Sequence, residues 1–100
     1  MKYIVLFEDN PDVGGDIRQQ LMPEHLSFLQ QNKQHVNAAG PLITVGGEGA
    51  GGLWVVEANS EPEVQRLVEA DPFWPTGLRN SVRVLVWKQV FADGSALARR

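Results

Sequence analysis

The chain has 100 residues, of which 43% are hydrophobic and 21% charged, values typical of one globular domain and not of a disordered segment. Its formal net charge is −3, so it has no basic surface of the kind that binds nucleic acid or an anionic membrane. It contains no cysteine, which excludes disulfides, thiolate nucleophiles and cysteine-ligated metals.

The first predicted element is a strand over Lys2–Glu8, rich in β-branched and aromatic residues and ended by a turn that begins at Asp9. This apolar run is far too short for a signal peptide or a membrane segment. We therefore take a cytoplasmic location as the default.

A helical pattern of apolar residues follows from about Asp16 to Gln34, with Pro23 inside it. A proline in a helix interior costs about 3 kcal/mol, whereas the first turn of a helix accepts one. We therefore expect a short helical turn over residues 16–21 and a main helix that begins near Pro23. His25 would then lie in the first turn of that helix, where the helix dipole favours a neutral imidazole.

Two further strands are predicted over Val36–Thr44 and Leu53–Ala58, joined as a hairpin by the glycine-rich connection Val45–Gly52. Gly40 and Pro41 indicate a bulge or an edge position in the first of them.

A second helix is expected to begin at Ser60, which suits the N-cap, and to end at Asp71, because the residue before a proline avoids the helical conformation. The last strand is predicted over Ser81–Phe91. Residues 1–91 thus form a single domain, and Ala92–Arg100 reads as a flexible tail.

The order of elements, β-α-β-β-α-β, indicates an α+β ferredoxin-like sandwich, in which two helices pack on one face of an antiparallel sheet. The strands are apolar at successive positions: in the first one, Val5 points to one face and Ile4 and Leu6 to the other. Because two helices cover only one face, a second copy of the chain is the simplest cover for the other face. We therefore expect a homodimer.

His25 lies on the apolar face of the first predicted helix, and Asp71 lies at the end of the second. Taken alone, each is more often structural: a core histidine satisfied by a backbone carbonyl, or a carboxylate in a helix-end turn. Because both helices pack on the same face of the sheet, the two side chains can converge. A carboxylate that orients an imidazole is the usual partner of a general base.

Five segments carry a family resemblance: residues 2–9, Pro23-Glu24-His25-Leu26, Ala39-Gly40-Pro41, Ala70-Asp71-Pro72-Phe73 with Gly77, and Lys88-Gln89-Val90-Phe91. In this order the segments resemble the YciI-like (YCII-related) family of small dimeric α+β barrel proteins. No single segment is specific; the resemblance lies in their ordered combination over about residues 1–91.

The resemblance implies a ferredoxin-like protomer, a dimer formed sheet to sheet, and a site built on His25 and Asp71. A dehydrochlorinase of chlorinated hydroxyquinols is among the relatives, and muconolactone isomerases share the fold. The commonest family pattern has an arginine three residues before the histidine, where this chain has Met22. Any anion contact that this arginine makes is therefore missing at that position.

Four residues near these segments are expected to bind substrate: Phe73, Trp74, Gly40 and Pro41. Trp74, which lies between two prolines, either walls a ligand pocket or fills the dimer interface.

The segment Gly47–Gly52 matches the pattern GxGxxG, but a strand follows it where a dinucleotide-binding motif requires a helix. A flexible hairpin, or a flap over the site, is the alternative. With His25 and His35 as the only histidines and no cysteine, neither a metal nor a cofactor is expected.

These observations favour an enzyme-like, small-molecule-binding dimer in which His25 acts as general acid or base and Asp71 orients it. The expected reaction is elimination, dehydrochlorination or isomerisation of a small cyclic substrate. Two alternatives stay open: a non-catalytic binding module that uses the same pocket, and a structural dimerisation domain in which His25 is a satisfied core residue. No nucleic-acid or membrane partner is expected.

Overall fold

The computed structural model describes residues 1–13 and 15–97. Its long strands are β1 (Lys2–Asp9), β2 (Val36–Ile43), β3 (Gly49–Glu57) and β4 (Arg79–Val86), and its α-helices are α1 (Gly15–Gln31) and α2 (Glu61–Ala70). The shorter elements are a 3₁₀ turn η1 (Trp74–Thr76), β5 (Phe91–Ala92) and β6 (Ser95–Ala96). Neither α-helix is both long and apolar enough to cross a membrane.

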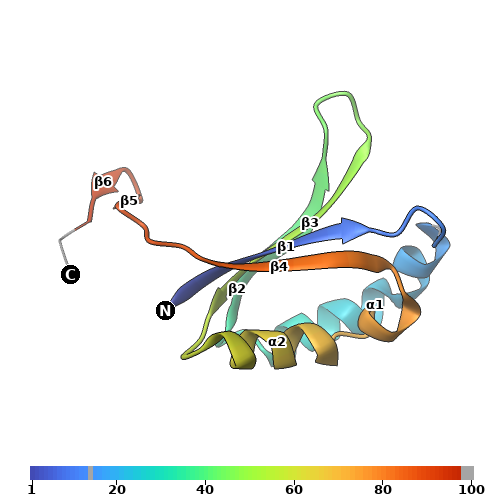
Figure 1. Ribbon diagram of the computed structural model, residues 1–100, viewed down its shortest axis with the longest axis horizontal. Helices are drawn as coiled ribbons and strands as arrows, with labels where there is room; N and C mark the ends of the chain where they lie inside the picture. Colours follow the sequence, from blue (N-terminus) through green and yellow to red (C-terminus); the bar gives the residue numbers. More distant parts are fainter. Residues whose placement is uncertain (14, 98–100) are drawn as a thin grey trace.

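The four long strands form one antiparallel sheet in the order β2-β3-β1-β4, and both helices lie on the same side of it (Figure 1). Strand β3 lies between β1 and β2, as the split β-α-β arrangement requires. The predicted ferredoxin-like α+β fold is confirmed. Gly40 and Pro41 lie on the edge strand β2, whose pairing with β3 shifts register just after Pro41.

Alternate side chains of the central strands form the core between the sheet and the helices. In β1, Tyr3, Val5 and Phe7 are buried. Val5 lies opposite Trp54 of β3, which is buried on the same face. Because successive side chains of a strand point to opposite faces, this register commits every second residue of β1 and β3 to the helices.

The other face of the sheet is largely apolar as well, as the strand patterns predict, with Arg83 of β4 opposite Leu6 as a charged exception. Its side chains are Ile4, Leu6, Leu53, Val55 and Leu85, which alternate with the core residues in the observed registers. Neither helix lies on this side of the sheet (Figure 1).

Helix α1 runs without interruption from Gly15 to Gln31, so the predicted break at Pro23 is wrong. Proline removes the hydrogen bond to the carbonyl four residues earlier, here that of Gln19. Both Pro23 and Gln19 are exposed, so water can replace the missing donor. His25 therefore lies in the middle of α1, beyond the first turn to which the helix-dipole effect is confined.

Several strand ends also differ from the prediction. Strand β3 begins at Gly49 instead of Leu53, because backbone hydrogen bonding between strands does not require apolar side chains. Strand β4 runs from Arg79 to Val86, whereas the prediction was Ser81–Phe91. Beyond β4, Phe91–Ala92 pairs with Ser95–Ala96 in a small hairpin, which begins at the last residue of the predicted strand and runs into the segment predicted as a tail. Residues 98–100 of that tail lie outside the described residues.

Gly51 of the β2–β3 hairpin lies against the backbone of β1. It is buried, its φ is 93°, and a Cβ atom there would lie 1.9 Å from the carbonyl oxygen of Phe7. Only glycine combines this left-handed conformation with so close an approach of two backbones.

We expect Gly51→Ala to lower the free energy of unfolding by more than about 1–3 kcal/mol, the cost of the backbone strain alone, because the clash with Phe7 adds to it. Urea unfolding followed by tryptophan fluorescence measures this change. Gly49→Ala is the matched control, since its Cβ meets nothing within 4 Å and its φ is not positive. Equal losses in the two variants would contradict the prediction.

Candidate functional site

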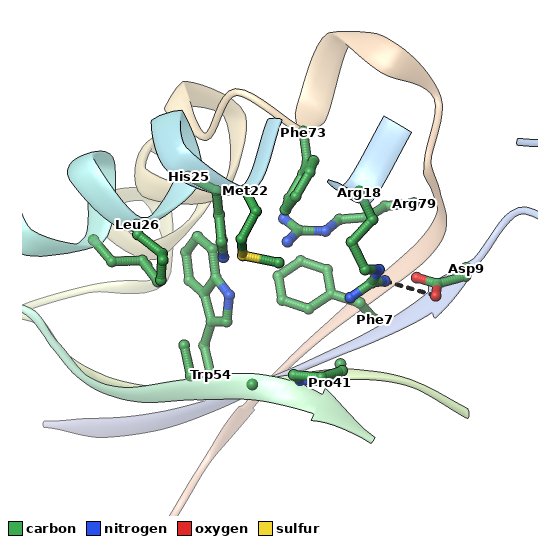
Figure 2. A pocket seen from close by; sticks show the side chains of 14 residues that line it. Phe7, Asp9, Arg18, Met22, His25, Leu26, Pro41, Trp54, Phe73 and Arg79 are labelled. Carbon is green, nitrogen blue, oxygen red and sulfur yellow. Dashed lines mark hydrogen bonds and ion pairs between the residues drawn. The ribbon is translucent and has the colours of Figure 1, made fainter. Parts of the chain in front are cut away.

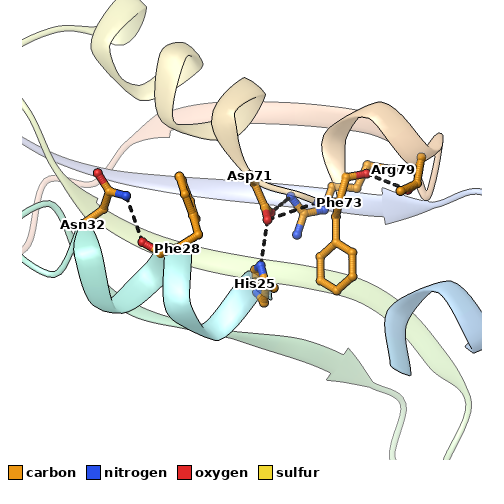
Figure 3. A network of polar contacts seen from close by, with 7 residues as sticks. His25, Phe28, Asn32, Asp71, Phe73 and Arg79 are labelled. Carbon is orange, nitrogen blue, oxygen red and sulfur yellow. Dashed lines mark hydrogen bonds and ion pairs between the residues drawn. The ribbon is translucent and has the colours of Figure 1, made fainter. Parts of the chain in front are cut away.

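Helices α1 and α2 bring His25 and Asp71 into direct contact (Figure 3). The Nδ1 atom of His25 lies 2.8 Å from Oδ1 of Asp71, and the two residues are 8% and 1% exposed. Asp71 caps the C-terminal end of α2, where the backbone turns extended before Pro72. The predicted convergence of the two side chains is therefore present, and their catalytic role stays a prediction.

The Asp71 carboxylate has two further partners. Its Oδ2 accepts a hydrogen bond of 2.6 Å from Nη1 of Arg79, and its Oδ1 also accepts a longer one of 3.3 Å from the backbone N–H of Phe73. The Asp71 side chain has no exposed surface. A buried carboxylate is tolerated only when it is paired and hydrogen-bonded in this way.

Arg79 is a site residue that no sequence motif indicates. It is the first residue of β4 and lies opposite Asp9 of β1. The one property of the sequence that could have indicated Arg79 is charge balance, because a carboxylate buried at a helix end needs a cation nearby. Arg79 follows Asp71 by eight residues, across the loop that contains η1.

The guanidinium of Arg79 is enclosed by aromatic rings. It stacks 3.9 Å from the ring centroid of Phe7 and lies 5.4 Å from those of Trp54 and Phe73. Burial lowers the pKa of Arg79 below its ordinary value, and the adjacent Asp71 carboxylate opposes that shift. The ring faces and Asp71 together offset the desolvation of the cation.

These contacts define how His25 is held. An ionised carboxylate only accepts hydrogen bonds, so in its contact with Asp71 the Nδ1 atom of His25 is the donor. The neutral ring then carries its lone pair on Nε2, which makes no hydrogen bond to residues 1–13 or 15–97. An imidazole held in this tautomer can take a proton from a ligand.

A cavity of about 110 Å³ opens beside His25, between α1 and the sheet (Figure 2). Phe7, Trp54 and Phe73 supply its aromatic walls. Flat apolar walls with a few polar groups are typical of sites that bind small cyclic molecules.

The predicted substrate-binding residues divide into two groups. Phe73, Gly40 and Pro41 line the cavity, whereas Trp74 does not and is 39% exposed. Phe73 and Trp74 are adjacent at the start of the η1 turn, so their side chains point in different directions. The structure therefore gives no support to a substrate contact by Trp74.

Two arginines supply the cavity with cations, although position 22 does not. Arg18 lies one helical turn before Met22 on α1, and both residues line the cavity, as does Arg79. Nη2 of Arg18 donates a hydrogen bond of 2.7 Å to Oδ2 of Asp9. The cavity therefore has two cationic side chains although position 22 is a methionine.

The glycine-rich segment Gly47–Gly52 leads from a turn directly into β3, so the helix that a dinucleotide-binding motif requires is replaced by a strand. Within the described ranges, no three His, Asp or Glu side chains gather as a metal site would need.

Fold and site together define a small ferredoxin-like α+β protein with a buried His–Asp–Arg cluster beside an aromatic cavity. The chain belongs to the YCII-related domain family, whose model matches residues 1–88. The family resemblance predicted from the sequence is therefore confirmed.

Among solved structures, the chain is similar to the 5-chloro-2-hydroxyhydroquinone dehydrochlorinase TftG of Burkholderia phenoliruptrix AC1100, in complex with 2,5-dihydroxybenzoquinone. The identity is 30%, the TM-score 0.76, and the match covers 88% of this chain and 94% of that one. No curated protein matches the chain.

Two more distant structures also match the chain. At3g17210 from Arabidopsis thaliana is 16% identical, with a TM-score of 0.48 and coverage of 92% of this chain and 97% of that one. A dimeric protein of unknown function with a ferredoxin-like fold from Bacteroides fragilis NCTC 9343 is 16% identical, with a TM-score of 0.47 and coverage of 84% and 90%.

We expect Arg79→Met to lower the free energy of unfolding by about 3–5 kcal/mol, because it leaves the Asp71 carboxylate buried without its cation. The double variant Arg79→Met/Asp71→Asn should lose less, since it removes the unpaired charge as well. Urea unfolding of both variants measures this order. Arg66→Met, at an exposed position of α2, is the control and should stay within about 0.5 kcal/mol of the parent protein. A double variant less stable than Arg79→Met would contradict the interpretation.

Proposed function

We propose that the protein catalyses proton transfer on a small hydroxylated ring, with His25 as the general base and acid and Asp71 as the group that orients it. The observation that carries this proposal is the arrangement of His25: it lines the cavity, and Asp71 holds its Nδ1 at 2.8 Å. A positioned imidazole of this kind contributes about 10²–10⁴-fold to a proton-transfer step.

The walls of the cavity support a ring as the substrate. Phe7, Trp54 and Phe73 offer aromatic faces on which a planar molecule can stack. The similar dehydrochlorinase is named for a chlorinated hydroxyhydroquinone and binds a dihydroxylated benzoquinone. We therefore extend the substrate class of hydroxylated, halogen-bearing rings to this chain.

In the proposed elimination, Nε2 of His25 removes a proton from a ring hydroxyl and returns it to the carbon that bears the chlorine, which gives the keto form. Removal of a second hydroxyl proton then drives out chloride, which leaves with the electron pair of the C–Cl bond. One proton and one chloride leave in total, and the ring becomes a hydroxylated quinone. The step needs no external oxidant, because the electron pair lost by the ring departs with chloride.

Proton transfer by His25 is tested by His25→Gln, which we expect to reduce kcat for chloride release from a chlorinated hydroxyhydroquinone by about 10²–10⁴-fold. His35→Gln is the matched control, because His35 is the other histidine of the chain and does not line the cavity. Chloride release is followed with an ion-selective electrode, and thermal unfolding shows that both variants fold.

Three results would contradict catalysis by His25. Equal turnover by the parent protein and His25→Gln would remove the histidine from the mechanism. Ring binding without turnover in the parent protein would identify a non-catalytic binding module. A large loss of stability in His25→Gln, with ring binding unchanged, would make His25 a structural residue.

We also propose that the protein works as a homodimer in which the uncovered face of the sheet packs against a second copy. Ile4, Leu6 and Val55 lie on this face, opposite the two helices. An apolar sheet face is stable in water only when another surface covers it, and two-fold pairing of identical faces is the commonest solution.

Sedimentation equilibrium at micromolar concentration is expected to give about twice the monomer mass of 11.1 kDa. Leu6→Arg should shift the protein towards the monomer, because it places a second cation directly beside Arg83 in the proposed interface. Gln30→Arg, on the exposed surface of α1, is the control and should leave the mass unchanged. A parent protein that sediments as a monomer would exclude the dimer.

A further inference from the structure

We infer that Arg18 and Arg79 form an oxyanion-binding site in the cavity, so that the protein selects rings with an ionised oxygen over neutral rings of the same size. This inference rests on the proposed function of the cavity as a ring-binding site and names its substrate class. It depends on three features of the described residues: the unused donors of Arg79, the position of Arg18, and the balance of charge at the cavity surface.

Arg79 is buried with most of its hydrogen-bonding capacity unused. Its side chain is 6% exposed, yet of its five N–H donors only one, on Nη1, is bonded within the described chain, to Asp71. The guanidinium also lines the cavity. Its unbonded nitrogens are not among the buried atoms without a partner, so they reach accessible space, and an anionic oxygen in the cavity would accept charge-assisted hydrogen bonds from them.

Arg18 adds a second cation from a different element. Its guanidinium lies 6.0 Å from the ring centroid of Phe73, and Figure 2 shows it beside the Phe7 ring on the same side as Arg79. Of the five N–H donors of Arg18, only one, on Nη2, is bonded within the described part of the chain, to Oδ2 of Asp9. Arg18 therefore keeps donors for a ligand while Asp9 fixes its position.

The charges that reach the cavity favour an anion. Arg18, Arg79 and Asp9 line it, whereas the Asp71 carboxylate lies behind Arg79 and does not. Arg18 is paired with Asp9 and Arg79 with Asp71, so these four charges cancel, but two guanidinium groups and only one carboxylate face a ligand. In a confined, largely apolar site, charge-assisted hydrogen bonds from two guanidinium groups stabilise an anionic oxygen more than a neutral one.

These features point to hydroxylated quinones, and to hydroxylated hydroquinones once a hydroxyl proton has been removed. A hydroxyl conjugated to a quinone carbonyl is a vinylogous acid, ionised at neutral pH, and its charge spreads over two oxygens. A pair of arginines matches such a distributed charge better than a lysine would. The same donors would stabilise the oxyanion that forms when His25 removes a hydroxyl proton.

Isothermal titration of the 100-residue chain with two rings tests the inference: 2,5-dihydroxybenzoquinone, which is ionised, and 2,5-dimethyl-1,4-benzoquinone, which is uncharged and similar in size. The chain has no cysteine to react with either quinone. We expect Arg18→Gln to weaken binding of the ionised ring by about tenfold to a hundredfold and to leave binding of the neutral ring unchanged. Arg18 is the position to change because Arg79 also holds Asp71.

Two further variants sharpen the test. Arg66→Gln, at an exposed position of α2, is the matched control and should bind both rings as the parent protein does. Arg18→Gln/Met22→Arg moves the cation by one helical turn along the cavity wall, and we expect it to recover preference for the ionised ring. Near-UV circular dichroism verifies that the buried Trp54 stays packed in every variant.

Equal affinity of the parent protein for both rings, or binding of neither, would overturn the inference. An unchanged preference in Arg18→Gln would overturn the role of Arg18, and a double variant as weak as Arg18→Gln would contradict the importance of the cation. Selective binding of the ionised ring without chloride release would uphold the oxyanion site and reject the proposed catalysis. Chloride release that depends on His25 but without charge preference would do the reverse.

Discussion

The burial of one carboxylate, that of Asp71, constrains the rest of this site. A carboxylate with no exposed surface is stable only if its oxygens are bonded to donors and its charge is balanced. His25 from α1, the backbone of Phe73 and Arg79 from β4 meet these needs. The elements that carry these groups are thereby held in one relative position, and the cavity lies beside that junction.

Sharing one carboxylate gives its two side-chain partners different properties. His25 is oriented but stays free to exchange a proton at Nε2, whereas Arg79 keeps its charge while most of its surface is removed from water. The aromatic rings around Arg79 make this possible, since they attract a cation without competing for its N–H donors. The result is an imidazole and a guanidinium side by side, with the negative charge of Asp71 placed behind them.

The sequence predicts the fold well because strand alternation and element order determine which residues face the helices. It also brings His25 and Asp71 together, since both helices have to lie on one face of the sheet. It misplaces the start of α1, because Pro23 points to solvent and the cost of a helical proline depends on that environment. The outward direction of a side chain is a tertiary property, and local sequence does not contain it.

Arg79 and Trp74 also show that local sequence does not determine which side chains reach the cavity: Arg79 was not predicted to do so, and Trp74 was. An arginine at the start of a strand reads as a surface residue until the partner that buries it is known. A tryptophan between prolines attracts notice, yet the cavity is lined by its neighbour Phe73. The charge requirement of a buried Asp71 was a physical clue to Arg79, and only the pairing of β1 with β4 identifies which arginine meets it.

The pairing of β1 with β4 joins the beginning of the chain to its last long strand. During synthesis, Asp71 therefore leaves the ribosome before the arginine that neutralises it. A nascent chain that ends before Arg79 can assemble β1 to α2, but it would bury an unpaired negative charge in doing so. Burial of Asp71 therefore depends on β4, and the wall of the cavity is complete only when that strand is in place.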